Sequence, residues 1–231
     1  MANDKIDWNP MQARLRELMK QKEDFANMRA LLLQMHSMVH CREVYAGTEP
    51  TYMDELWENL EDTVFRTMPT TKDDTIAWNI WHITRIEDLT ANYLIADREQ
   101  VLEETWNRRL NTMVTDTGNA MTDEEIISFS NEVDRDALCQ YRNEVGRRVK
   151  EILEDLQFED LKRKVPQKGI RRIAEAGGVS TRPEAAWLLD FWGRKNVAGI
   201  LLMPITRHQV VHLNDSRRLK GVCKRLGKTD R

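Results

Sequence analysis

The segment from Thr75 to Ala96 constrains the fold of this chain more than any other part of the sequence. Its apolar residues fall on most sides of a helical wheel and leave little room for a polar face. A helix of this kind is packed on most of its sides rather than lying at a surface. We therefore predict a central helix that other helices surround, with His82 in its middle.

Three further segments have the apolar spacing of long helices, and we expect them to pack around the central one. They cover residues 9–40, 134–156 and 205–226. The first begins at Asn9 and Pro10, which are typical of an N-cap and a first helical position, and it is either one long helix or a broken one. Shorter helices are expected at 52–60, near Trp106, after Thr122 and at 184–192.

The composition agrees with a helical fold, because 41% of the residues are apolar, 32% are charged, and only 10 are Gly and 6 are Pro. We predict an all-α protein, specifically a four-helix bundle with short helical insertions. No internal repeat divides the 231 residues, so we expect a single domain over 1–231. Within it, residues 1–24 form an N-terminal extension and residues 161–183 a basic insertion.

The net charge and the cysteines indicate which partners and which cellular compartment to expect for this chain. The net charge of −3 does not favour a nucleic-acid or membrane partner, and the basic residues at 162–172 lack interleaved aromatic side chains. Cys41, Cys139 and Cys223 are an odd number at unrelated spacings, which indicates a reducing compartment. The start of the chain has no signal-peptide pattern, and the longest apolar run, at 197–205, is too short to span a membrane. A cytoplasmic location is the expectation.

Four of the five histidines form two pairs four residues apart, which places each pair on one face of a helix. His208 and His212 can therefore present two imidazoles to one metal ion, with His82 as a third ligand from the central helix. The alternatives are a hydrogen-bonded core histidine at 82 and an ordinary surface pair at 208 and 212. His36 and His40 have no third ligand of their own in this pattern, so we expect core or pocket-lining roles for them, with one of them near the ion.

Arg85 and Trp78 lie within one turn of His82 and are candidates for contact with a substrate or cofactor. The guanidinium of Arg85 could anchor a substrate carboxylate, and its alternative is a salt bridge. Trp78 could line a cofactor pocket, and its alternative is a core tryptophan.

Three acidic residues are candidate acceptors for the ligand imidazoles. Asp215 follows His212 by three residues and is the best placed, so it is a tentative catalytic residue together with Arg85. Glu87 and Asp88 are the other two, and for Glu87 a helix cap or surface ion pair is the favoured alternative.

Two segments give the chain a resemblance to a known family. The residues TIAWNIWHITRIEDLTANYL (75–94) and MPITRHQVVHLND (203–215) resemble the two metal-binding helices of the DinB-like superfamily. In that superfamily a histidine of the second helix and an HxxxH pair of the last helix bind a divalent ion, and His82, His208 and His212 match those positions. The resemblance covers roughly residues 30–226, and the extension and the basic insertion lie outside the usual pattern. Related bundles are often dimers, so a homodimer is implied as well.

The resemblance implies a divalent-metal protein, and the superfamily is similar to thiol-dependent isomerases and S-transferases. Three imidazoles leave at least one coordination position open, which is typical of a catalytic metal site. We therefore expect a metal-dependent transferase or isomerase that uses a small thiol, with Zn, Ni or Fe as the ion. The alternative is a stress-related or partner-binding protein whose metal is structural or vestigial. The sequence leaves open whether the protein is an enzyme.

Overall fold

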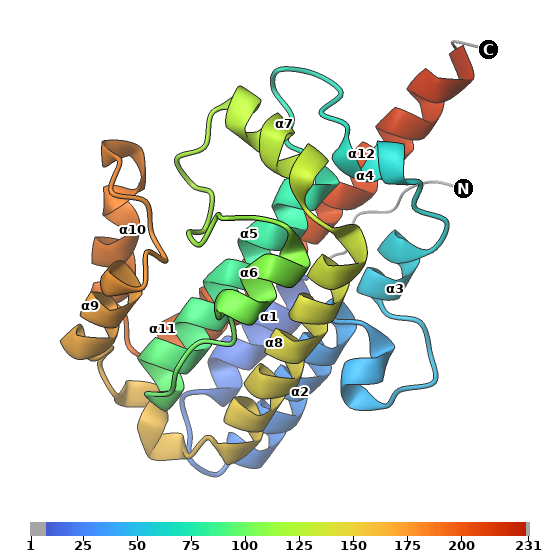
Figure 1. The fold of residues 1–231 in the computed structure, drawn as a ribbon. Coiled ribbons are helices and arrows are strands. Elements are labelled where there is room, and N and C mark those ends of the chain that lie inside the picture. The colour runs from blue at the N-terminus through green and yellow to red at the C-terminus, as the bar shows by residue number, and fades with distance from the viewer. Residues whose placement is uncertain (1–7, 230–231) are drawn as a thin grey trace.

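The computed structural model describes residues 8–229 (Figure 1). Side chains are described as far as Leu226. Over this range the regular structure is helical and no β-strand is present, which confirms the all-α prediction. The α-helices are α1 (Asn9–Leu18), α2 (Phe25–Val39), α3 (Tyr52–Trp57), α4 (Asp62–Arg66), α5 (Ile76–Leu89), α6 (Glu104–Leu110), α7 (Asp123–Glu132), α8 (Arg135–Asp155), α9 (Gln167–Glu175), α10 (Pro183–Gly193), α11 (Val197–Leu202) and α12 (His208–Thr229). Two 3₁₀ helices, η1 (Arg42–Tyr45) and η3 (Phe158–Lys162), and two π-helical segments, η2 (Thr90–Ala96) and η4 (Met203–Arg207), complete the set.

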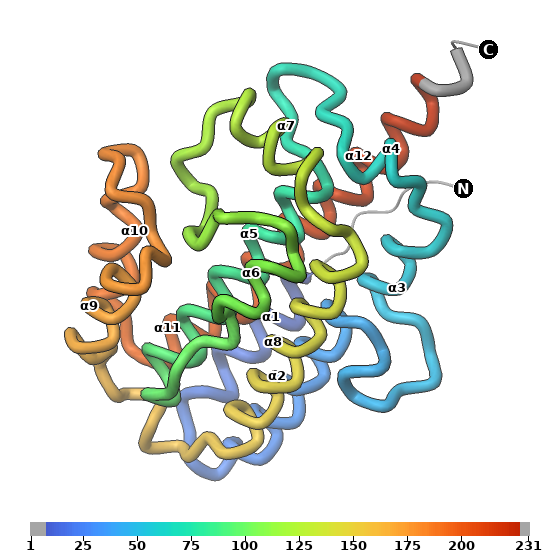
Figure 2. The backbone as a smooth tube through the Cα atoms, viewed as in Figure 1, coloured from blue at the N-terminus to red at the C-terminus, as the bar shows by residue number. Residues whose placement is uncertain are grey.

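The four long segments expected from the sequence pack against one another. The helix α5 contacts α8 and α12, and α2 contacts the same two helices. The shorter helices α3, α4, α6 and α7 lie along the flanks of these four (Figure 2). The structure therefore places more short helices around the long ones than the sequence predicted, including α4 and α9.

The central position predicted for the segment after Thr75 is confirmed. Every residue of α5 is buried. The helix begins where the Thr75 side chain accepts a hydrogen bond from the backbone N–H of Trp78 at 2.9 Å, a typical N-cap. After Leu89 the helix continues with the wider turns of η2 as far as Ala96, so the predicted end of the segment is also correct.

The last long segment begins earlier than predicted, at Val197 rather than near residue 205, and it contains a π-helical bulge. Pro204 has no backbone N–H and its ring crowds the preceding turn, so a regular α-helix cannot pass through it. Polar side chains bind the carbonyls that the bulge releases: Thr206 Oγ1 donates to Leu201 O at 2.8 Å, and Gln12 Nε2 donates to Leu202 O at 2.7 Å. His208 is then the first residue of α12.

The N-terminal segment is broken, which was one of the two expected forms. The chain turns between α1 and α2, and Trp8 rather than Asn9 occupies the N-cap position. Leu15 of α1 is fully buried and belongs to the same hydrophobic core as residues of α5, α8 and α12. The described part of the predicted N-terminal extension, residues 8–24, therefore contributes to the core.

Two basic side chains of the basic insertion form ion pairs with acidic residues from another segment of the chain. Lys168 and Arg172 of α9 bind Asp97 at 2.7 and 2.9 Å, and Arg172 also binds Glu99 at 2.6 Å. Acidic residues after η2 thus compensate two of the basic side chains. Among the residues described, no helix combines the length and the apolar character needed to cross a membrane.

Candidate metal centre

The structure brings His82, His208 and His212 together at the contact between α5 and α12. The ring centroids of the three imidazoles are 4.6 to 5.0 Å apart in all pairs. One nitrogen from each ring can be chosen so that the three atoms lie within 4.8 Å of one another. His82 is buried, whereas His208 and His212 are partly exposed. The cluster therefore has an enclosed side on α5 and a side that solvent reaches.

Hydrogen bonds orient two of the three imidazoles. His82 Nδ1 lies 2.6 Å from the carbonyl oxygen of Thr117, and His212 Nδ1 lies 2.5 Å from Asn79 Oδ1. A carbonyl oxygen can only accept, so each Nδ1 carries the proton and donates it. In the neutral ring the lone pair is then on Nε2, the nitrogen left free to bind a metal ion.

Asp215 acts on this cluster through Asn79. The carboxylate Oδ2 of Asp215 accepts from Asn79 Nδ2 at 3.1 Å, while Asn79 Oδ1 accepts from His212. Asp215 was predicted to accept directly from His212. The structure instead places the amide of Asn79 between them, bound to both. Asn79 precedes His82 by three residues on α5, so helix spacing alone could have identified it. No sequence pattern could have identified the carbonyl of Thr117 as the partner of His82.

All three imidazoles are neutral at pH 7, as metal ligands must be. Burial and the charge of His212 lower the pKa of His82 to about 3, although the hydrogen bond to Thr117 opposes this shift. Burial lowers the pKa of His212 to about 4, and burial together with His82 and His212 lowers the pKa of His208 well below its usual value. His208 Nδ1 is buried without a hydrogen-bond partner in the structure. Three neutral nitrogen donors in one place suit a divalent transition metal.

Trp78 stacks on His82, which lies one turn later on the same helix, α5. Its ring is stacked on His82, with centroids 4.5 Å apart and planes inclined by 10°. Its Nε1 donates to the carbonyl oxygen of Gly118 at 3.3 Å, next to the carbonyl that holds His82. Gly118 has a φ of +75°, and a Cβ there would lie 2.6 Å from Trp78 Nε1, so this close approach requires glycine. Trp78 therefore covers one face of the cluster.

Arg85 is fully buried and forms the salt bridge that the sequence left as an alternative. Its Nη1 binds Asp88 Oδ2 at 2.9 Å and Tyr141 Oη at 2.9 Å, and its Nη2 binds Gln100 at 2.9 Å. Asp88 in turn accepts hydrogen bonds from the backbone N–H groups of Val101 and Leu102. Arg85 and Asp88 thus hold residues 100–102 against α5. These hydrogen bonds give no support to the substrate contact predicted for Arg85.

Glu87 departs from the prediction of a cap or a surface ion pair. It is fully buried, since α5 directs it into the core between α2 and α8. His36 Nε2 lies 2.8 Å and His40 Nε2 3.2 Å from Glu87 Oε1. The two histidines therefore have a third polar partner, and together they form a second cluster that the sequence pattern did not reveal.

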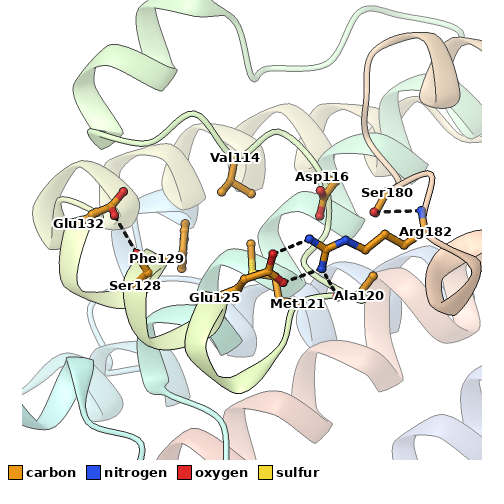
Figure 3. A pocket seen from close by; sticks show the side chains of 10 residues that line it. All are labelled: Val114, Asp116, Ala120, Met121, Glu125, Ser128, Phe129, Glu132, Ser180 and Arg182. Atoms are coloured by element: carbon orange, nitrogen blue, oxygen red, sulfur yellow. Dashed lines mark hydrogen bonds and ion pairs between the residues drawn. The ribbon is translucent and has the colours of Figure 1, made fainter.

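A surface cavity of about 290 Å³ lies beside the loop that holds His82 and Trp78 (Figure 3). Asp116, Glu125 and Arg182 line it, and Arg182 crosses it to bind Glu125 at 2.6 and 2.5 Å. None of the three histidines of the metal centre lines this cavity. It is therefore a separate feature of the loop and α7.

Comparison with known protein families matches residues 48–214 to the DinB superfamily. The matched range contains His82, His208 and His212, whereas His36 and His40 precede it. No curated protein matches the chain. Because the match covers well over half of the 231 residues, the chain belongs to the DinB superfamily.

Proposed function

We propose that this protein binds a divalent metal ion at His82, His208 and His212 and uses it in a transferase or isomerase reaction with a small thiol. The observation that carries the metal part is the convergence of three neutral imidazoles from α5 and α12 within 4.8 Å. Zinc, nickel and iron all accept such donors.

The catalytic part of the proposal rests on charge and access. Neutral ligands leave the charge of the ion uncompensated, and three of them leave a coordination position for another molecule. A divalent ion in such a site lowers the pKa of a thiol or water bound to it. The partial exposure of His208 and His212 supports entry from that side.

The residues around the three imidazoles have defined tasks in this proposal. Thr117 O and Asn79 Oδ1 keep the His82 and His212 protons on Nδ1, and Asp215 orients the amide of Asn79. Trp78 excludes water from the buried face of His82. A cytoplasmic homodimer, which the family resemblance and composition favour, is part of the same hypothesis.

The test uses protein purified without a histidine tag. Metal content is measured first, and consumption of cysteine, glutathione, bacillithiol and mycothiol is then followed with a chlorodinitrobenzene electrophile. We expect consumption of a thiol that depends on the metal and disappears in His82→Ala. Val211→Ala changes an exposed neighbour of His212 on α12 and is the matched control.

Two outcomes would contradict the proposal in different ways. Thiol consumption that continues unchanged in metal-free protein would reject a catalytic role for the ion. A bound ion without any thiol consumption would favour the alternative, in which the metal is structural and the protein binds a partner.

A further inference from the structure

We propose that His36, His40 and Glu87 form a second divalent-metal site, separate from the three-histidine centre. His36 lies on α2 and His40, four residues later, is the C-cap of that helix; both direct Nε2 at the Glu87 carboxylate of α5. One ligand atom from each residue can be chosen so that all three lie within 4.8 Å of one another. Two imidazoles and one carboxylate are a common ligand set for zinc and for iron.

The distances from the two imidazoles to the carboxylate are close to those between ligands of a common ion. Nε2 of His36 is 2.8 Å from Glu87 Oε1, and Nε2 of His40 is 3.2 Å from Oε1 and 3.1 Å from Oε2. Ligand atoms about 2.1 Å from one ion, at tetrahedral or octahedral angles, lie roughly 3.0 to 3.4 Å apart. An ion could therefore replace the two Nε2 protons with small movements of the side chains.

Hydrogen bonds alone leave this cluster incompletely satisfied. The side chains of His36, His40 and Glu87 are fully buried. Glu87 Oε2 nevertheless accepts no well-aligned hydrogen bond, although His40 Nε2 lies 3.1 Å from it, and His40 Nδ1 has no hydrogen-bond partner in the structure. A buried carboxylate oxygen that accepts no well-aligned hydrogen bond is costly, and coordination by an ion would reduce that cost for Oε2.

Tyr45 can support either state of the cluster. Its hydroxyl lies 2.7 Å from His36 Nδ1. A hydroxyl can both donate and accept, so it can donate to Nδ1 when Nε2 carries the proton and accept from Nδ1 when Nε2 binds an ion. The second arrangement is the usual support of a metal-bound imidazole.

The positive charge of Arg142 lowers the affinity of this site for a metal ion. Its guanidinium is held by Thr84 Oγ1 at 3.2 Å, Val39 O at 2.8 Å and Gln209 Oε1 at 3.0 Å. These bonds keep Nη1 4.0 Å from Glu87 Oε2, beyond hydrogen-bonding distance. The carboxylate oxygen thus stays available, but the positive charge opposes a cation, so the site binds more weakly than its ligands alone would.

This site differs from the metal centre in its place along the chain and in its access. His36 and His40 precede the range that matches the DinB superfamily, so the site joins a segment outside the match to the matched helix α5. Because all three side chains are buried, loading must accompany folding or a local opening. The test therefore supplies the ion during refolding.

The full chain is unfolded in guanidinium with a chelator, refolded with excess Zn²⁺, desalted and analysed for zinc per chain. We expect two ions in the wild type and one in Glu87→Gln. We also expect one ion in a chain with His82→Gln, His208→Gln and His212→Gln. Asp88→Asn removes another buried carboxylate of α5 and should keep both ions, so it controls for a general loss of stability.

The outcomes separate this site from the proposed function. A wild type that binds one zinc ion, which Glu87→Gln retains and the triple variant loses, would overturn the second site. A triple variant that binds no zinc would overturn it as well. One ion in the wild type that persists in the triple variant and disappears in Glu87→Gln would support the second site and count against the three-histidine centre. If Glu87→Gln does not refold, the triple variant still decides, since its second site is intact.

Discussion

His82 and Glu87 lie five residues apart on α5, and each belongs to a cluster that contains two histidines four residues apart from another part of the chain. Five residues correspond to roughly 140° around a helix axis, so the two side chains leave α5 on different faces. His82 meets α12, and Glu87 meets α2. A single central helix can therefore build two polar clusters within one core, provided that every side of it is covered.

The two clusters differ in charge and in exposure. The three-histidine centre has no carboxylate ligand, is neutral at pH 7 and reaches solvent through His208 and His212. The second cluster is closed and contains Glu87, with the charge of Arg142 nearby. Burial raises the pKa of Glu87, but the charges and hydrogen bonds of His40 and His36 outweigh it, so the pKa lies below its usual value and the carboxylate stays ionised. We therefore assign the proposed chemistry to the open site and expect the closed site to contribute to stability.

The largest expected effect that separates the clusters is the response of the metal-free protein to acid. The folded pKa values of His82, His212 and His208 lie below 6.5, the value expected in the unfolded chain. Between that value and about pH 4 the unfolded chain binds protons that the folded chain does not, so stability falls as the pH falls. Each histidine contributes up to about 1.4 kcal/mol per pH unit in that window.

Urea unfolding with a chelator present, at several pH values from 7.5 to 4.5, measures this loss. The triple variant His82→Gln, His208→Gln, His212→Gln should have a flatter pH dependence than the wild type. Burial also lowers the pKa of His40, to about 3, but His40→Gln removes one such histidine rather than three and should therefore change the slope less. Equal slopes in the wild type and the triple variant would show that the three histidines are not protected from protons in the folded state.

The next effect concerns the buried charge of the second cluster. In Glu87→Gln the guanidinium of Arg142 keeps its charge and loses the nearby carboxylate. Removal of one partner from a buried charge pair costs about 3 to 5 kcal/mol. We expect a loss of this order in metal-free protein, and a smaller loss in His82→Gln, which leaves no charge unpaired. Chemical denaturation of both variants at pH 7.5 tests the difference, and similar losses would contradict the contrast drawn between the clusters.

Sequence reasoning identified one cluster and missed the other for a physical reason. The histidines at 82, 208 and 212 could be grouped because two follow helical spacing and the third lies alone in an apolar helix. Glu87 is also on that helix, but periodicity does not tell which side of a helix that is buried all round meets α2. Spacing therefore could not pair Glu87 with His36 and His40.

The fold shows the same division between local and tertiary information. Helical periodicity predicted α5 with its start correct to one residue, since the expected first residue, Thr75, is the N-cap and the helix begins at Ile76. The π-helical bulge at η4 was missed, because it depends on how Gln12 and Thr206 bind the carbonyls before Pro204. Asn79 could have been found from its spacing to His82, whereas the carbonyl of Thr117 comes from a loop that only the folded chain places there.

A smaller effect tests the support of the ligands on the open side. Asn79→Ala removes the acceptor of His212 Nδ1 and the link to Asp215. Loss of such a partner typically lowers metal affinity roughly 10- to 100-fold. We expect this loss at the three-histidine centre alone, measured by competition with a chelator in a Glu87→Gln background. Unchanged affinity would mean that Asn79 does not orient His212.

The smallest effect tests the packing of the closed side. Gly146 of α8 lies against His40, and a Cβ there would be 2.6 Å from His40 Nδ1. Gly146→Ala gains about 1 kcal/mol of helix propensity, but overpacking of a buried ring typically costs about 1 to 3 kcal/mol. We expect a net loss of up to about 2 kcal/mol on this basis, measured by denaturation. Zinc at the three-histidine centre should be unchanged, because His40 contacts Glu87 and not that centre. A net gain in stability would show that the ring has room to move, and the second cluster would then be less tightly built than its burial indicates.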